Sequence, residues 1–176
     1  MQTGALVAIV VLICTDIMIH TAGMDVKQFF NQFEPIWTSK TTRRGLIQCE
    51  VVRLESVRPF AIKFNRCVFI GGRRCTLGIL GLRDTQRKDR LTLFHRDIFQ
   101  ATESLLFMAF DHSCAIFRVE SLIQWDHVYY DLRLRNSSVH TRPLPVCQHY
   151  FRHAIGNQRS FNVYNPECQW LIRQEN

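Results

Sequence analysis

Hydrophobic and polar positions along most of the chain alternate with the short period of a β-sheet. Between positions 36 and 135, runs rich in Val, Ile, Phe and Tyr are separated roughly every ten residues by polar or glycine-containing turns. This regularity is typical of an all-β barrel or sandwich. The pattern predicts eight strands, at residues 36–40, 45–55, 60–69, 74–82, 90–95, 104–111, 114–120 and 126–135.

Two short turns indicate how neighbouring strands pair. The turn 70–73 contains two adjacent glycines, which tolerate the positive φ angles of a tight hairpin. Folding about Gly71 sets Cys67 opposite Cys75. The polar turn 111–113 separates two apolar segments, so the strands on either side of it are predicted to be antiparallel neighbours.

Helical spacing is confined to the two ends of the predicted barrel. Apolar positions in residues 25–33 recur with the period of a helix, and Asp25 is a suitable N-terminal cap. A second helix is predicted over 146–155, where it stops at Gly156. The tail that follows, residues 161–172, is expected to pack back on the barrel.

The first 23 residues resemble a secretory signal. An unbroken apolar run covers positions 5–14, and the small residues at 21–23 form a cleavage region. A membrane anchor is the alternative, but ten apolar residues fall short of the ~20 that a spanning helix needs. We therefore expect residues 1–23 to be a signal peptide and residues 24–176 to form a single secreted domain with no membrane association.

The cysteines favour disulfides over metal binding. Six remain after the predicted signal, and an even number in a secreted chain indicates three disulfides. A structural zinc site is disfavoured because no CxxC pair is present. His149 and His153 lie four apart on the predicted helix, but the Glu of a zinc-protease motif is missing, so a solvated helix face is the preferred interpretation. No metal or cofactor is expected.

The net charge favours anionic partners. All 22 Lys and Arg residues follow position 23, whereas one acid precedes it, so the mature chain has 22 basic and 14 acidic residues and a formal charge of +8. The basic pairs at 43–44, 73–74 and 87–88 are scattered rather than gathered in a stripe, so nucleic acid is not predicted. The sequon at Asn136 predicts an exposed N-glycosylation site.

The sequence lacks the common motifs of enzyme active sites. The sequence contains no GxSxG, P-loop, GxGxxG or HExxH pattern, so an enzyme is not predicted. A barrel of eight strands is wide enough to hold one small ligand among its inward side chains. Ligand binding is therefore the default prediction, and a filled barrel with an external working surface is the alternative.

Several segments together resemble one protein family, the tick salivary lipocalins, which include the histamine-binding proteins of tick saliva. The resemblance spans most of residues 24–176 and is most specific at its C-terminal end. The residues that carry it are Trp37, Cys49, Cys114-Ala115-Ile116, Tyr130-Asp131-Leu132-Arg133, Leu144-Pro145-Val146-Cys147 and Val163-Tyr164-Asn165-Pro166-Glu167-Cys168.

The resemblance implies a lipocalin-like barrel and a disulfide pattern. It joins Cys49 to Cys168 and Cys114 to Cys147. Cys67 and Cys75 then pair by elimination, and only this pair has independent support, from the hairpin between them.

The resemblance also locates a ligand site. Family members that capture biogenic amines have acids and an aromatic residue where this chain has Ala115, Asp131 and Arg133, so the amine site is degraded. If the family's inward face holds, Tyr129, Asp131 and Arg133 point into the barrel. Arg133 either pairs with Asp131 or meets the carboxylate of a fatty-acid-like mediator such as a leukotriene. Together with Trp37, these are the predicted pocket residues.

The resulting prediction is a secreted, monomeric binding protein that sequesters a small host mediator. The loss of an acid at Ala115 and the gain of a cation at Arg133 favour an acidic lipid over histamine or serotonin. A hypothesis of a different class is that the outer surface binds a host plasma protein, with the basic charge steering association.

Overall fold

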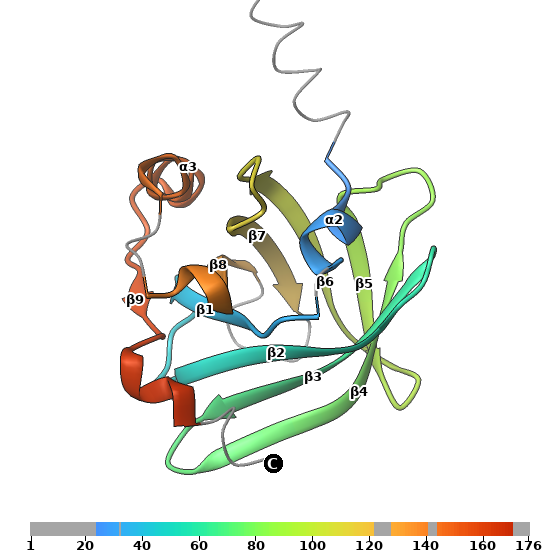
Figure 1. Cartoon of the computed structure of the whole chain (residues 1–176), viewed down its shortest axis with the longest axis horizontal. Helices are drawn as coiled ribbons and strands as arrows, with labels where there is room; N and C mark the ends of the chain where they lie inside the picture. The colour runs from blue at the N-terminus through green and yellow to red at the C-terminus, as the bar shows by residue number, and fades with distance from the viewer. Residues whose placement is uncertain (1–23, 32, 122–127, 141–143, 171–176) are drawn as a thin grey trace, which may run out of the picture.

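The architecture is a closed antiparallel barrel. The computed structural model describes residues 24–31, 33–121, 128–140 and 144–170, so the predicted signal peptide lies outside the described residues. Each strand pairs with the next in sequence, and β1 pairs with both β2 and β8, which closes the barrel (Figure 1). The eight strands are β1 Ile36–Thr41, β2 Gln48–Val57, β3 Ala61–Phe69, β4 Arg73–Arg83, β5 Arg90–His95, β6 Ile98–Met108, β7 Cys114–Ser121 and β8 Val128–Arg135.

The predicted fold class, an eight-stranded antiparallel barrel with one helix near each end of the domain, is confirmed. Most strand boundaries agree with the prediction to within about three residues, within the usual uncertainty of such assignments. The largest error is β6, which begins at Ile98 rather than at residue 104. Arg96 and Asp97 form the preceding turn with positive φ angles of 50° and 62°. This hairpin carries no glycine, which explains why the pattern did not reveal it.

Helix α2, Val26–Phe30, closes one end of the barrel. Asp25 caps it by accepting a hydrogen bond from the Lys27 amide at 3.0 Å, as predicted, although the helix is shorter than the expected 25–33. The Val26 amide donates to the carbonyl oxygen of Lys88 in the loop between β4 and β5. The buried faces of Phe29 and Phe30 fill this end of the barrel, which we call the closed end.

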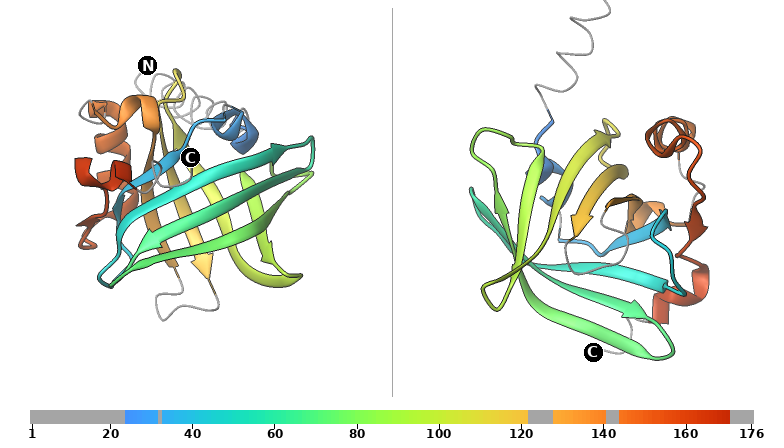
Figure 2. Two further views of the ribbon diagram at one scale, coloured as in Figure 1. Left: turned by 60° about the horizontal axis from the view of Figure 1, so that its bottom comes forward. Right: turned by 180° about the vertical axis from the view of Figure 1, so that it is seen from behind.

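Helix α3, Pro145–Ile155, packs against the outside of β6, β7 and β8 (Figure 2). Its buried side chains Cys147, Phe151 and Ile155 lie at helical spacing, whereas His149 and His153 are on its exposed side. Within the described ranges, no group of three or more His, Cys, Asp or Glu side chains is arranged to hold a metal. No helix in the described part of the chain is long and apolar enough to span a membrane.

The tail returns to the outer wall of the barrel. Strand β9, Phe161–Asn162, pairs with the end of β1, and the 3₁₀ helix η2, Pro166–Gln169, follows. The structure contains the disulfides Cys49–Cys168, Cys67–Cys75 and Cys114–Cys147, which tie the tail to β2, β3 to β4 and α3 to β7. Cys67 and Cys75 are directly opposite each other in the β3–β4 register.

Candidate ligand-binding site

Strand β8 places two of the predicted pocket residues inside the barrel. Alternation along the strand turns Asp131 and Arg133 to one face, and at most 1% of either residue's surface is exposed. The Arg133 guanidinium donates two hydrogen bonds of 2.7 Å to Glu103 on β6 and a third of 2.9 Å to Asp131. It also lies 4.5 Å from the centre of the Phe117 ring. Arg133 is therefore paired with two carboxylates inside the protein.

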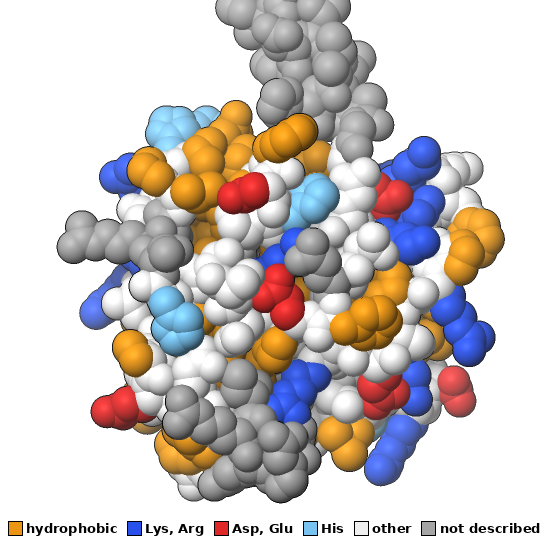
Figure 3. Space-filling model, in the orientation of Figure 1, with side chains coloured by type: hydrophobic (Ala, Val, Ile, Leu, Met, Phe, Trp, Pro, Cys, Tyr) orange, Lys and Arg blue, Asp and Glu red, His pale blue; other side chains and the backbone are white. Residues whose placement is uncertain are grey.

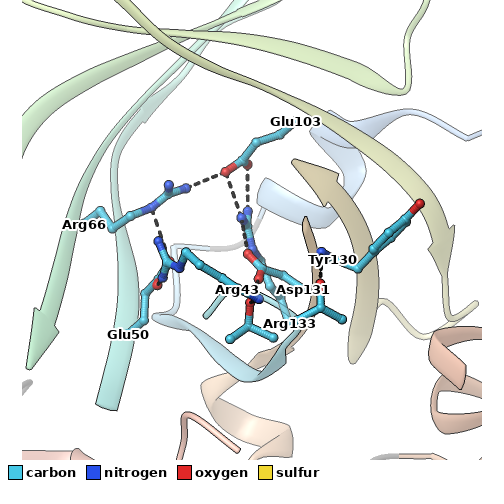
Figure 4. Close-up of polar contacts among 9 residues, drawn as sticks. Arg43, Glu50, Arg66, Glu103, Tyr130, Asp131 and Arg133 are labelled. Carbon is cyan, nitrogen blue, oxygen red and sulfur yellow. Dashed lines mark hydrogen bonds and ion pairs between the residues drawn. The ribbon is translucent and has the colours of Figure 1, made fainter. Parts of the chain in front are cut away.

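The same contacts continue across the barrel as an alternating series of charges (Figure 4). Glu103 accepts a 2.6 Å hydrogen bond from Arg66 on β3, and Arg66 forms an ion pair of 3.7 Å with Glu50 on β2. Glu50 in turn pairs with Arg43 in the loop after β1. We call this set the ionic chain; its members are Arg43, Glu50, Arg66, Glu103, Arg133 and Asp131.

The neighbours of each carboxylate set its protonation. Burial alone would raise the pKa of Glu103, but the charges and hydrogen bonds of Arg133 and Arg66 outweigh burial and lower the pKa to about 2. Arg43 and Arg66 likewise lower the pKa of Glu50 against the effect of burial. The pKa of Asp131 is raised instead, because burial and the charge of Glu50 prevail over its contacts with Arg133 and Thr41.

Beyond the ionic chain, the barrel has a cavity at the end opposite α2, which we call the open end. The cavity has a volume of about 330 Å³ and begins where the ionic chain stops, at Arg43 and Arg66. Tyr129 lines this cavity. The Arg43 guanidinium lies over the Tyr129 ring, with its central carbon 5.1 Å from the ring centre. The lining residues of this inner cavity are Arg43, Ile47, Arg66, Val68, Ile70, Arg74, Thr76, Ile79, Leu93, Gln100, Ala101, Ser121 and Tyr129.

Burial also keeps the Tyr129 phenol protonated. Desolvation raises its pKa well above the usual range, against the opposing charge of Arg43. At neutral pH the cavity floor therefore presents a neutral hydroxyl, able to donate a hydrogen bond, beside two guanidinium groups.

The structure separates the four predicted pocket residues. Tyr129 lines the inner cavity, whereas Asp131 and Arg133 lie deeper in the ionic chain. Trp37 is on the outer side of the wall, because its neighbour Ile36 takes the inward position on β1. The Trp37 indole packs on Tyr164 with ring centres 5.1 Å apart and donates a 2.8 Å hydrogen bond to the Asn136 side-chain oxygen. Trp37 therefore anchors the tail.

Asn136 is half-buried and holds this outer contact together. Its side-chain oxygen accepts a second hydrogen bond of 3.0 Å, from the Gln169 amide. An N-linked glycan attaches to the side-chain nitrogen, so these contacts are compatible with the predicted modification. Glycosylation at Asn136 stays a prediction.

The sequence interpretation missed four members of the ionic chain: Arg43, Glu50, Arg66 and Glu103. A signal for two of them exists in the strand pattern. On β6, Glu103 lies two residues after Ala101 and two before Leu105, both of which point inward. On β3, Arg66 lies two residues after the inward-pointing Phe64. A charged residue in the apolar phase of a strand indicates a buried charge that needs a partner.

Comparison with solved structures places this geometry in a known fold. The chain superposes on a protein called AM182, solved as a complex with serotonin, with a TM-score of 0.64 and 17% sequence identity over 82% of this chain and 92% of that one. The chain has a lipocalin-like fold. No protein-family model matches the sequence, and no curated protein is similar to it.

Two further solved structures share the lipocalin-like fold. The siderocalin Ex-FABP matches with a TM-score of 0.56 and 10% identity, over 75% of this chain and 93% of that one. Japanin from Rhipicephalus appendiculatus, bound to cholesterol, matches with a TM-score of 0.56 and 7% identity, over 78% and 96% of the two chains. At these identities the likeness establishes the fold, and the chemistry of the site follows from this chain's own residues.

Proposed function

We propose that this protein is secreted and sequesters a small acidic amphiphile in the inner cavity of its lipocalin-like barrel. The predicted signal at residues 1–23 and the three disulfides support secretion. The mechanism is capture rather than turnover.

The observation that carries the proposal is the charge of the cavity lining. Arg43, Arg66 and Arg74 line the cavity, and none of its lining residues in the described ranges is an Asp or Glu. The remaining wall is largely aliphatic. A carboxylate at the floor would receive charge-assisted hydrogen bonds, and a hydrocarbon chain would contact the wall. The cavity volume, about 330 Å³, lies at the small end of the range for ligand pockets.

An amine is the competing ligand, because one protein of this fold was solved with serotonin. An ammonium group needs an available carboxylate or aromatic faces. Here Glu50, Glu103 and Asp131 each contact a guanidinium, so binding an amine would require an existing ion pair to break. Neighbours solved with serotonin and with cholesterol support small-molecule capture in general, and the lining favours the acid.

The test is calorimetric titration of the oxidised protein, residues 24–176, with arachidonate, a leukotriene, histamine and serotonin at physiological salt. Arachidonate or the leukotriene is expected to bind, and the amines are not. Arg74 is exposed and forms no ion pair with any described residue, so Arg74→Gln should leave the fold intact. We expect it to weaken binding of the acid by about two- to fivefold, the scale of an exposed ion pair.

Arg58→Gln is the matched control. Arg58 is an exposed arginine in the turn between β2 and β3, at the closed end of the barrel, so its loss changes net charge equally without touching the cavity. Equal effects of the two variants would mean that only long-range attraction matters. Tight binding of an amine with no binding of either acid would overturn the proposal.

A further inference from the structure

Strand β4 is paired along only part of its length on the side of β5. Residues 80–83 pair with β5, from Leu80 opposite Phe94 to Arg83 opposite Leu91. Along residues 73–79, no described strand is paired with that edge, although β3 pairs with the other edge. Figure 1 shows β4 continuing along the lower side of the barrel while β5 runs away from it. The barrel wall is therefore split beside the first half of β4.

The split has a hollow on each side. Inside is the inner cavity, lined here by Thr76 and Ile79. Outside is a groove of about 730 Å³, whose lining includes the apolar Leu77, Leu80 and Phe94 and the polar or charged Lys63, His95, Arg96 and Asp97. We call this the outer groove. Thr76 lines both hollows, so this side chain lies between them.

On β5, as on β4, neighbouring residues line opposite hollows. On β5, Leu93 lines the inner cavity and the next residue, Phe94, lines the outer groove. The apolar side chains of the groove are poorly covered: Leu77 is 62% exposed and Leu80 36%. Exposed apolar side chains gathered in a groove are typical of a contact surface rather than of ordinary surface.

We infer that the split is a lateral portal, through which the hydrocarbon tail of a long-chain acid leaves the inner cavity and lies in the outer groove. This inference rests on the proposed function and specifies its ligand class. The carboxylate binds at Arg43 and Arg66, the first methylenes fill the inner cavity, and the chain passes Thr76 to reach Leu77 and Phe94. A chain too long for the inner cavity is then bound along its length.

The same surface has an unpaired strand edge, to which a peptide could add as a further β-strand, and this is the alternative to the portal. The portal is favoured because the two hollows lie on either side of Thr76 and each includes aliphatic side chains. In addition, Arg74 at the start of this strand lines the inner cavity and not the outer groove.

The experiment is a titration series with saturated fatty acids of eight to eighteen carbons, each below its micelle concentration, on the oxidised protein. Each buried methylene should tighten binding by about fourfold. With the portal, affinity rises through the whole series. In Leu77→Asp, which changes an exposed side chain, octanoate should bind as in wild type, and octadecanoate should bind at least about tenfold more weakly.

Leu82→Asp is the matched control on the same strand, since Leu82 is 41% exposed and lies outside the groove. It should reproduce the wild-type series. A Leu77→Asp series identical to wild type, or a wild-type affinity that levels off at short chains, would overturn the portal and leave the proposed function standing. If no acid of any length binds, the proposed function itself fails.

Discussion

The two ends of the barrel are built from opposite chemistry. At the closed end, Phe30 of α2 stacks on Phe64 with ring centres 6.3 Å apart, and Phe29 of the same helix lies 5.7 Å from Phe117. At the open end, Arg43, Arg66 and Arg74 surround a cavity. The same alternation of inward positions supplies both ends. The identity of the inward residues therefore decides whether a stretch of barrel is filled or left open.

The ionic chain is the boundary between these two ends. Its arginines stack on aromatic rings of the packed interior, Arg66 on Phe64 and Arg133 on Phe117, while Arg66 also reaches the cavity. Buried ions are costly to desolvate and are held only when paired. The outer surface differs from this interior. On the face seen in Figure 3, Lys and Arg side chains are dispersed among hydrophobic and acidic ones.

The boundary should be the most sensitive part of the molecule. Glu103→Gln removes the charge shared by the buried Arg133 and the partly buried Arg66. We expect the free energy of unfolding to fall by about 4 to 5 kcal/mol, the upper part of the range for breaking a buried pair. Urea denaturation with the disulfides intact measures it. Glu120→Gln, in a half-exposed pair with Arg118, is the control and should cost under about 1 kcal/mol. Equal losses would show that the ionic chain has no special role.

At the closed end, Phe30→Ala should cost about 3 to 4 kcal/mol. Phe30 is fully buried, and the lower half of the range for such truncations applies because α2 is short and adjusts to the cavity. Phe33→Ala is the matched control: its side chain is 68% exposed, so the change should stay within about 0.5 kcal/mol. Thermal or urea unfolding distinguishes the two. A small effect of Phe30→Ala would mean that the closed end is not the stable half.

Acid should weaken the boundary before the packed end. The pKa of Glu103 is about 2 in the folded protein against an ordinary 4.5, so its contribution is complete above pH 4.5 and is lost as the pH falls toward 2. That shift corresponds to about 3 kcal/mol. Asp131 acts in the opposite sense: its pKa is raised, so the folded state takes up a proton first as the pH falls and gains stability.

Urea unfolding between pH 7 and pH 2 tests the opposite contributions of Glu103 and Asp131 to the free energy of unfolding. The wild type should lose stability below pH 4.5, and Asp131→Asn should lose it more steeply, because the opposing contribution of Asp131 is gone. A flat profile in this range would contradict the assigned role of Glu103.

The smallest effect should come from the cap of the closed end. Asp25→Ala removes the hydrogen bond to the Lys27 amide and an ion pair of 3.2 Å with Arg83. We expect a loss of about 1 kcal/mol. Asp25→Asn keeps a capping oxygen and should recover most of it. If Asn proves as damaging as Ala, the ion pair with Arg83 rather than the cap holds α2 in place.

Much of the fold was predictable because its signals are local. Alternation over a few residues defines a strand, two glycines define the hairpin between Cys67 and Cys75, and Asp25 defines a helix start. Strand β6 was misplaced where a local signal was missing, at the turn Arg96-Asp97. For the site, alternation placed Asp131 and Arg133 on one face of β8, so their contact was predictable, whereas the inward direction of that face came from the family resemblance.

The rest of the site required the closed barrel. Glu103 meets Arg133 across 30 positions of sequence and Arg66 across 37, because strands from three parts of the chain converge on one interior. No short-range sequence pattern indicates that these residues contact one another. The same holds for Trp37, which the returning tail covers on the outside. The sequence alone determined most of the strands, the two helices and the charged pair on one face of β8. Barrel closure decided which charges pair and which guanidinium groups reach the cavity, since register across strands is a property of the whole sheet.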